Sequence, residues 1–256
     1  MAHHWDPERY LTYADERGRP FVELVQRIDA DAPRTVVDLG CGPGNLTQRL
    51  AGRWPHATVT GLDSSPEMIA RARKDVPAID FAVADLRAWA PAAPVDVLVS
   101  NATLQWIPGH LELLPALFGH VAAGGWLAFQ VPGNFGEPSH TLLADLSAEP
   151  RYASHLQHLV PNRSHDAATY LGALEGVAKQ VDAWETTYLH VLPGADAVFT
   201  WISGTGARPT LAALPPDLRA EFETEYRARL RAAYPLRRDG TVVLPFRRIF
   251  VVAERA

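Results

Sequence analysis

Short runs of apolar and β-branched residues alternate, over the first half of the chain, with stretches in which apolar residues recur every three or four positions. The runs indicate buried strands, and the spaced stretches indicate helices that pack on them. Strands are predicted at 35–39, 57–62, 79–83, 95–100 and 126–131. Helices are predicted at about 45–53, from Pro66 onward and at about 110–121. Because strands that alternate with helices form a parallel sheet covered on both faces, we expect a doubly wound, Rossmann-like α/β fold.

The spacing changes after Val131. A turn-rich loop, helices with loops and a sixth strand are predicted at 132–140, 141–179 and 181–191 in turn. A seventh strand is predicted at 241–253. The segment 192–240 before it carries helical signals near 195–204 and 217–233 and is far too long for a hairpin turn. We therefore expect a seven-stranded sheet with a helical insertion between its last two strands.

A glycine-rich turn follows the first predicted strand. Asp38 lies near the end of the strand, and Gly40, Gly42 and Gly44 come after it. Glycines allow positive φ angles and a close approach of ligand to backbone, and the start of the next helix offers unpaired N–H groups. The turn does not match the dinucleotide pattern GxGxxG, because the sixth position from Gly40 is Asn45, and the Gly-Lys-Ser/Thr of a P-loop is absent. It is a candidate cradle for another ligand.

Two further acids come at the ends of the next two predicted strands: Asp63 closes the second, and Asp85 follows the third. The carboxyl ends of parallel strands meet at one edge of the sheet, and open α/β sheets bind their ligands there. We therefore expect three carboxylates, including that of Asp38, at the ligand-binding edge.

Composition narrows the classes of function. The 256 residues are 47% apolar, which suits a globular protein with a full core, and the formal net charge of −5 provides no basic surface for nucleic acid or an anionic membrane. No apolar run has the length of a spanning helix, and the N-terminus shows no signal peptide. The single cysteine, Cys41, excludes an intramolecular disulfide and a cysteine zinc site. We expect a cytoplasmic monomer without a metal ion.

Four segments together resemble the class I S-adenosylmethionine-dependent methyltransferases. They are VVDLGCGPGNLT (36–47), TGLDSSPEMI (60–69), ADLRAW (84–89) and VDVLVSNATLQW (95–106). The resemblance implies that the glycine turn passes under the methionine part of the cofactor and that Asp63 accepts both ribose hydroxyls. It implies that Met68 packs on the adenine and that Asp85, with Leu86 beside it, takes the adenine amino group. Asn101 would face the methionine end.

The resemblance thus gives a set of cofactor-binding candidates near the carboxyl ends of four strands. They are Asp38, Gly40, Gly42, Gly44, Asn45, Asp63, Ser64, Met68, Asp85, Leu86, Asn101 and Gln105. It also suggests three parts of the chain: N-terminal cap helices at 1–30, a cofactor-binding half of the core at 31–131, and the rest of the core at 132–256. The last part would include the helical insertion at about 192–240 as a substrate lid.

From end to end the chain is similar to the trans-aconitate 2-methyltransferases. The matching segments are WDPERYL (5–11), LDSSPEMIA (62–70), SNATLQWIPGH (100–110), VPGNFGEPSH (131–140), VDAWETTYLH (181–190) and LPFRRIFVVAE (244–254). This similarity implies an enzyme that forms the monomethyl ester of trans-aconitate, a small tricarboxylate, and releases S-adenosylhomocysteine. A carboxylate is ionised at neutral pH, so no catalytic general base is expected.

The carboxylates that are not methylated need cations, and the arginine fork suits them. Arg208, Arg247 and Arg248 are candidates, and at most one of the last two should face the site because adjacent strand residues point to opposite sides. The substrate-binding candidates are Tyr10, Tyr13, Trp106, Asn134, His140, His190, Arg208 and Arg248.

Alternatives remain open at this point. A hydroxyl acceptor would require a base near the methyl group, such as His140 or His190. Another small carboxylate, a non-catalytic S-adenosylmethionine-binding protein and a nicotinamide oxidoreductase are further possibilities. A nucleic-acid base is disfavoured as acceptor, because the fourth strand is followed by Asn101-Ala102-Thr103-Leu104 and not by an Asn/Asp-Pro-Pro-aromatic motif.

Overall fold

Seven strands form one mixed sheet in the order β3-β2-β1-β4-β5-β7-β6 in the computed structural model, which describes residues 14–256. The strands are β1 Thr35–Leu39, β2 Thr58–Asp63, β3 Asp80–Val83, β4 Val95–Asn101, β5 Val121–Pro132, β6 Ala178–Pro193 and β7 Thr241–Arg255. The neighbours β3, β2, β1, β4 and β5 pair in parallel, and β7 runs antiparallel to β5. This arrangement confirms the predicted seven-stranded α/β fold.

The chain divides into two compact units. The first comprises the described residues up to Pro132 together with Ser164–Glu185 and Arg248–Ala256, and the second comprises Gly133–Arg163 and Thr186–Arg247. The long strands β6 and β7 therefore contribute to both units. The segment 192–240 lies wholly in the second unit, where it is joined by 133–163. Its role as a lid stays a prediction.

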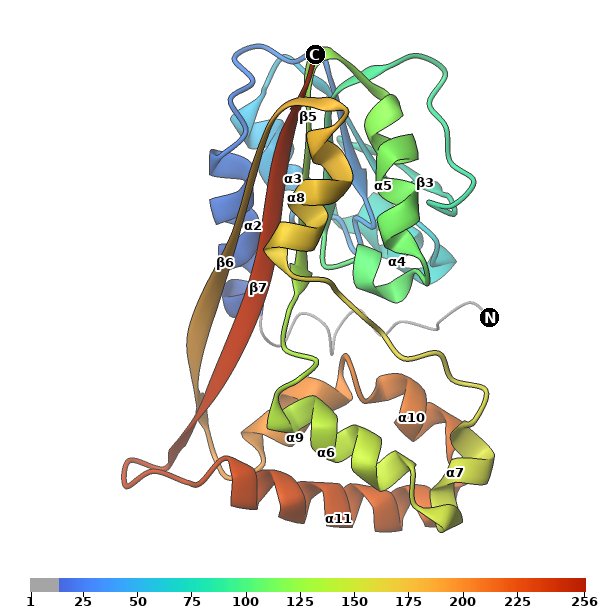
Figure 1. Cartoon of the computed structure of the whole chain (residues 1–256), viewed down its shortest axis with the longest axis vertical. Coiled ribbons are helices and arrows are strands. Elements are labelled where there is room, and N and C mark those ends of the chain that lie inside the picture. The colour runs from blue at the N-terminus through green and yellow to red at the C-terminus, as the bar shows by residue number, and fades with distance from the viewer. Residues whose placement is uncertain (1–13) are drawn as a thin grey trace. The chain divides into compact units, whose positions relative to one another are not determined.

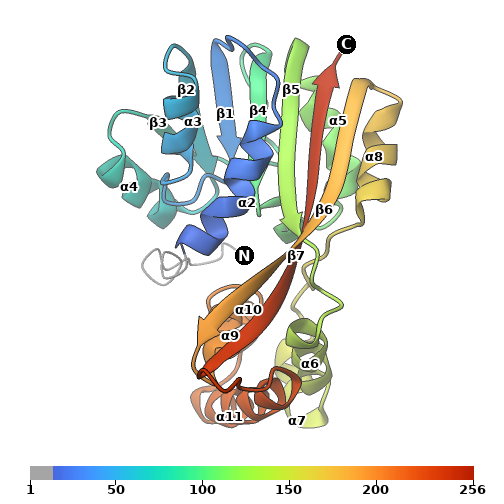
Figure 2. The same ribbon diagram turned by 90° about the vertical axis from the view of Figure 1, so that its left-hand side faces the viewer.

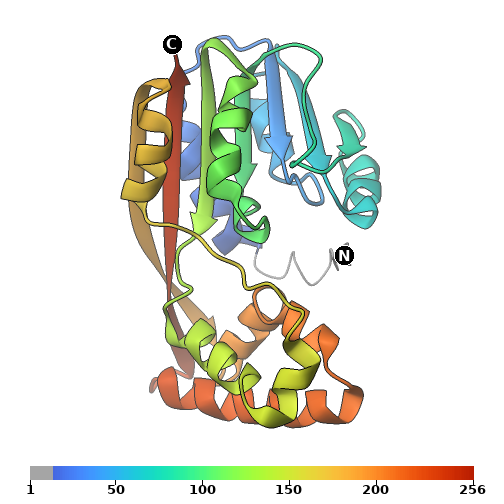
Figure 3. The ribbon, with the colours of Figure 1, turned by 45° about the vertical axis from the view of Figure 1, so that its right-hand side comes forward.

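The helices of the first unit cover both faces of the sheet. They are α2 Ala14–Gln26, α3 Thr47–Arg53, α4 Pro66–Asp75, η1 Leu104–Trp106, α5 His110–Gly119 and α8 Ala167–Glu175. Helix α2 lies over one face (Figure 2), and α5 and α8 lie over the other (Figure 3). Helix α3 begins two residues later than predicted, since Asn45 and Leu46 still belong to the glycine turn.

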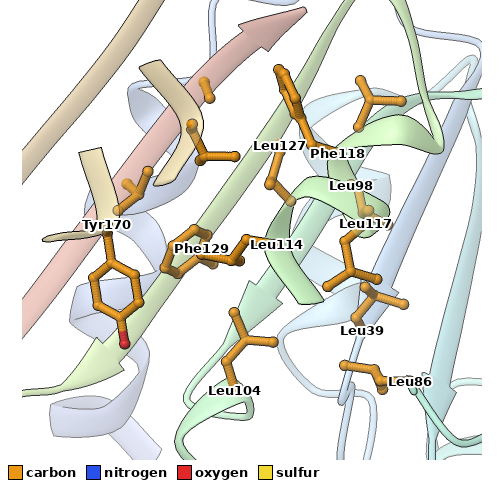
Figure 4. Packing of buried hydrophobic residues seen from close by; sticks show 14 of the residues in the cluster. Leu39, Leu86, Leu98, Leu104, Leu114, Leu117, Phe118, Leu127, Phe129 and Tyr170 are labelled. Atoms are coloured by element: carbon orange, nitrogen blue, oxygen red, sulfur yellow. The ribbon is translucent and has the colours of Figure 1, made fainter. Parts of the chain in front are cut away.

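An apolar cluster lies between the sheet and the pair α5–α8. Leu114, Leu117 and Phe118 of α5 and Tyr170 of α8 pack against alternate residues of the central strands, among them Phe129 (Figure 4). Each fully buried leucine or phenylalanine contributes about 2 kcal/mol through apolar area removed from water. This cluster holds the sheet rigid below the edge where β1, β2 and β4 end.

Strand β5 begins earlier than predicted. The helix was predicted to run to about 121 and the strand to begin at 126, but α5 ends at Gly119, and Gly124 and Gly125 lie inside the strand. The register with β4 shifts there, and Gly124 has a φ of 71°. A Cβ on Gly125 would lie 2.7 Å from the Asp96 carbonyl oxygen, so the pair forms an irregularity that only glycine permits.

The second unit is helical apart from the outer parts of β6 and β7. Its helices are α6 Pro138–Ser147, α7 Pro150–Leu156, α9 Ala197–Ser203, α10 Arg208–Ala213 and α11 Pro216–Ala233. Helix α11 packs along α6 and α9 (Figure 1). Helices α9 and α11 match the two predicted helical signals, whereas the six-residue α10 was missed because it is too short to show a periodic pattern.

Two further boundaries differ from the prediction. The predicted loop 132–140 ends early, because Pro138 starts α6 as a first-turn proline. Strand β6 extends beyond the predicted 181–191 at both ends. Among the helices from Ala14 onward, none combines the length and the apolar character needed to span a bilayer.

Candidate functional site

The glycine turn after β1 has the conformation that its sequence predicts. Gly40, Gly42 and Gly44 have φ angles of 78°, 55° and 81°. A Cβ on Gly40 would collide with the Thr103 side chain, and one on Gly44 would lie 2.7 Å from the Phe81 ring. A Cβ on Gly42 would meet no other described residue within 4 Å beyond its chain neighbours. The turn is therefore packed at its two ends and open at its centre.

Asp38 lies at the base of this turn with only 2% of its surface exposed. Its Oδ2 accepts a 2.7 Å hydrogen bond from Thr47 Oγ1, while its Oδ1 has no hydrogen-bond partner among residues 14–256. Burial raises the pKa of Asp38 to about 7, and the Thr47 hydrogen bond opposes that rise. An unpaired buried acceptor of this kind suits a ligand with a positive charge or a hydrogen-bond donor.

Asp63 stands beside the turn at the end of β2. Its Oδ2 accepts from the Gly42 N–H at 3.0 Å, and its Oδ1 accepts from the Ser65 N–H at 2.8 Å. Burial raises the pKa of Asp63 above its ordinary value, and these backbone N–H groups oppose the rise. A carboxylate has about four lone-pair positions, so both oxygens can accept further hydrogen bonds.

The start of α4 supports Asp63. Ser65 caps this helix, because its hydroxyl accepts from the Met68 N–H at 3.2 Å, while the neighbouring Ser64 is exposed. Met68 is buried on the inner face of α4. The adenine contact expected of Met68 stays a prediction.

Asp85 has a partner that we did not predict. Its carboxylate forms a bidentate pair with Arg87, with Nε 3.0 Å from Oδ1 and Nη2 2.5 Å from Oδ2. This guanidinium holds the pKa of Asp85 below its usual range. Leu86 between them is buried in the main apolar cluster. An adenine amino group at Asp85 would therefore share the carboxylate with Arg87.

The turn after β4 is held by its own side chains. Ala102 has a φ of 53°, a conformation that residues with a Cβ rarely adopt. Gln105 Nε2 donates to the Ala102 carbonyl at 2.5 Å, and Thr103 Oγ1 donates to the Asn101 carbonyl at 3.2 Å. Gln105 Oε1 is buried and has no hydrogen-bond partner within the described part of the chain. Backbone strain of this kind gathers at functional sites.

The two adjacent arginines of β7 have different partners. Arg248, 5% exposed, directs Nη1 toward Gln130 Oε1 at 3.4 Å. Arg247 donates from Nε to the Gly133 carbonyl at 2.7 Å. Gln130 was not among the predicted site residues, although a single polar residue inside the apolar run 126–131 marks it in the sequence.

Several substrate candidates lie in the second unit. Asn134 Nδ2 and His140 Nδ1 are 3.5 Å apart, and Ser139 Oγ is 3.1 Å from the same ring nitrogen. Burial lowers the pKa of His140 to about 4, so its imidazole is neutral at neutral pH. The structure thus brings Asn134 and His140 together.

The remaining candidates have other surroundings. His190 stacks on Trp201 with ring centroids 4.7 Å apart. Arg208 is half-buried at the start of α10, and burial lowers its pKa. Trp106 ends η1 in the first unit and is half-buried, as is Asn45 in the glycine turn. The predicted Tyr10 and Tyr13 lie outside the described residues.

Comparisons with known proteins identify the family and the fold of this chain. Residues 36–125 match the family model described as a methyltransferase domain. The fold is similar to that of the YcgJ protein from Bacillus subtilis, with a TM-score of 0.62 at 11% sequence identity over 93% of this chain and 98% of that one. The residues matched by the family model include the glycine turn and the ends of β1, β2 and β4.

Much closer relatives span the whole chain. A trans-aconitate 2-methyltransferase of Mycolicibacterium gilvum is 51% identical, with 98% of both chains covered. One of Streptomyces avermitilis is 49% identical, with 98% of this chain and 97% of the relative covered. Because similarity at this level extends over nearly the full length of both partners, the chain belongs to the trans-aconitate 2-methyltransferase family of class I methyltransferases.

Proposed function

We propose that the protein is an S-adenosylmethionine-dependent carboxyl O-methyltransferase that forms the monomethyl ester of trans-aconitate and releases S-adenosylhomocysteine. The observation that carries this proposal is the identity of 49% and 51% to relatives of that name along nearly the whole chain. The chemistry of the site supports it in three steps.

The first step is the cofactor. S-Adenosylmethionine is positively charged at its sulfur and carries an ammonium group, and the edge of the first unit offers two buried oxygen acceptors without partners among the described residues, Asp38 Oδ1 and Gln105 Oε1. The open centre of the turn at Gly42 leaves room for a ligand against the backbone. Asp63 would accept the ribose hydroxyls with the lone pairs that its two N–H bonds leave.

The second step is the transfer. When bound, the cofactor supplies a methyl group that is already activated by the positive sulfur. A carboxylate acceptor is ionised at neutral pH, so no side chain has to remove a proton. The chain's residues therefore contribute by binding the reactants in line and by excluding water. His140, neutral and hydrogen-bonded through Nδ1, would act as a pocket residue and not as a base.

The third step is recognition of the acceptor. A tricarboxylate keeps negative charge on the two groups that do not react. Arg248 would bind one of them, because it is a nearly buried guanidinium on the strand next to β5, and a fork-shaped donor pairs with a carboxylate through two hydrogen bonds. Arg208 is a second candidate from α10.

The test is release of S-adenosylhomocysteine by the purified protein with trans-aconitate, cis-aconitate, citrate, isocitrate or buffer alone. We expect release with trans-aconitate, and proton NMR of the product would identify the esterified carboxyl group. Release no greater than in buffer, with S-adenosylmethionine still bound in calorimetry, would contradict the acceptor and retain the cofactor.

We also propose that the reaction takes place in the cytoplasm, because a chain with a single cysteine has no intramolecular disulfide and suits a reducing compartment.

We expect the protein to be a monomer, and light scattering after gel filtration tests this expectation.

A further inference from the structure

We propose that Gln130 is a positioning residue for this reaction: its amide joins Asn101 at the cofactor edge to Arg248, and so fixes how an acceptor carboxylate is presented to the methyl donor. This inference rests on the proposed function. It adds a residue that no sequence motif assigned, near the C-terminal end of β5 and 1% exposed.

Strand register places the three side chains in one row. Asn101 of β4 is the partner of Gln130 in the parallel pairing, and Phe250 of β7 is its partner on the other side. Arg248 lies two residues from Phe250, so it points to the same face of the sheet. The neighbouring Phe129 and Val131 belong to the apolar cluster with α5 and α8. The polar row is therefore on the opposite face, at the end of β4 and β5.

The hydrogen bonds of the row have a fixed direction. A guanidinium can only donate, so Gln130 must turn Oε1 toward Arg248 Nη1, 3.4 Å away. Its Nε2 then donates to Asn101 Oδ1 at 2.5 Å. Asn101 therefore turns its amide oxygen toward Gln130 and directs its Nδ2 donors elsewhere. Gln130 thus orients the Arg248 cation at one end of the row and the Asn101 N–H donors at the other, and both favour an anionic acceptor.

The Gln130 backbone holds the same site. Its carbonyl oxygen accepts from the Ala102 N–H at 2.9 Å, which stabilises the turn with the positive φ. That turn carries Gln105, whose amide donates to the Ala102 carbonyl. A position that served packing alone would carry an apolar residue, as Phe129 and Val131 do, because burying an amide costs free energy unless both its ends are paired.

The decisive variant is Gln130→Glu. A carboxylate cannot donate, so it would pair with the Arg248 charge and force Asn101 to rotate its amide oxygen outward. Both ends of the row would then disfavour an anion. We expect the KM for trans-aconitate to rise about tenfold or more, the scale of a lost hydrogen bond to a charged group. The KM for S-adenosylmethionine should rise less than the KM for trans-aconitate, because Asn101 is only one of several cofactor-binding candidates.

Gln130→Met keeps the length of the side chain and removes its polarity. Arg248 and Asn101 would both lose their alignment, so we expect a lower kcat for ester formation and a smaller rise in the KM for trans-aconitate than in the glutamate variant. Gln180→Glu on the exposed part of β6 is the matched control, since it adds the same charge to the first unit. It should leave both KM values unchanged.

The outcomes separate the two proposals. Wild-type protein that makes no ester contradicts the proposed function, whatever the variants do. Active wild-type protein with unchanged KM values in both Gln130 variants overturns the positioning role. The positioning role is also overturned if both variants have only a lower melting temperature and a smaller active fraction, while KM and kcat per active site stay constant. A rise in the KM for trans-aconitate in Gln130→Glu that exceeds the loss of S-adenosylhomocysteine affinity in calorimetry supports it.

Discussion

Thr47 donates a 2.7 Å hydrogen bond from Oγ1 to Asp38 Oδ2, and both side chains are buried. The bond joins the first residue of α3 to the acid next to the last residue of β1, across the glycine turn. It satisfies one carboxylate oxygen and leaves the other without a described partner. Asp38 is thereby held in position at the cost of an incompletely solvated charge. Function and stability should therefore oppose each other at this residue.

Replacing Asp38 by asparagine should stabilise the unliganded protein at high pH. The folded state keeps a proton on Asp38 up to about pH 7, whereas the unfolded chain releases it near 3.8. Asp38 therefore contributes stability at low pH that is lost as pH rises through this window. Asp38→Asn retains an acceptor for Thr47 and cannot ionise. Urea unfolding should show a gain on the order of 1–4 kcal/mol at pH 8 that vanishes near pH 4.

The exposed Asp145 supplies the control for this experiment, because Asp145→Asn makes the same change in charge on the surface of α6. Its stability should stay within about 0.5 kcal/mol of wild type at each pH. S-Adenosylhomocysteine affinity should fall in Asp38→Asn and not in the control. Equal pH dependence of unfolding in wild type and Asp38→Asn would show that burial does not disfavour the Asp38 charge.

Substitutions in the glycine turn can separate an effect on the free energy of unfolding from an effect on cofactor affinity. Gly42→Ala places a Cβ where no other described residue lies within 4 Å, so it should cost only about 1 kcal/mol for the positive φ. If the space belongs to the cofactor, calorimetry should nevertheless show tenfold or greater loss of S-adenosylhomocysteine affinity, about 1.4 kcal/mol or more.

Two further glycines calibrate that result. Gly40→Ala drives a Cβ into the Thr103 side chain and should lower the unfolding free energy by about 2–4 kcal/mol. Gly52→Ala in α3 meets nothing within 4 Å among the described residues and should stabilise the helix by about 0.5–1 kcal/mol. A Gly42→Ala protein that binds the cofactor as wild type does would remove the turn's centre from the site.

The periodic signals in the sequence were sufficient to predict most of the elements of the sheet. β1 was predicted residue for residue, because its apolar run is bounded by polar residues and a glycine turn. The early start of β5 could not be predicted, because Gly124 and Gly125 carry the same turn signal whether they end a helix or interrupt a strand. The close approach of the Asp96 carbonyl decides between these cases, and this contact exists only in the folded chain.

The parts of the site whose residues are adjacent in the sequence could be predicted, whereas contacts between residues far apart in the sequence could not. Asp38 and the three glycines form one motif, so their common turn could be predicted. Gln130 and Arg248 are far apart in the chain and meet only because β5 and β7 pair. The Asp85–Arg87 pair was missed for another reason: spacing alone does not show that two nearby charges will face each other.

His140 should influence acid stability and contribute little to the methyl transfer. Burial lowers its pKa to about 4 from an ordinary 6.5, so the folded state resists a proton that the unfolded chain accepts. The stability that follows from this is present above pH 6.5 and is lost as pH falls toward 4. His140→Gln should therefore be more stable relative to wild type at pH 5 than at pH 7.5. This slope opposes that of Asp38, so the two variants must be measured separately.

The turnover of His140→Gln tests the absence of a general base. We expect kcat/KM for trans-aconitate to fall by less than about tenfold, whereas loss of a general base costs about 100- to 10,000-fold. A larger loss confined to kcat, with a lost titration limb in the pH profile, would favour a hydroxyl acceptor instead. His158, exposed in the second unit, provides the matched His→Gln control.

Arg248 should determine acceptor affinity more than cofactor affinity. Arg248→Gln removes a nearly buried cation from the row with Gln130 and Asn101, and a charge-assisted bidentate contact with a substrate carboxylate would be lost with it. The KM for trans-aconitate should rise about 10- to 100-fold, the equivalent of about 1.5–3 kcal/mol. S-Adenosylhomocysteine affinity should change by less than about threefold, since its proposed partners are on β1, β2 and the turn after β4. Arg238→Gln at an exposed position makes the same change in net charge and should leave both quantities unchanged. An equal loss of trans-aconitate and S-adenosylhomocysteine affinity in Arg248→Gln would mean that this arginine supports the whole edge of the sheet, and the acceptor carboxylate would then have to bind another cation.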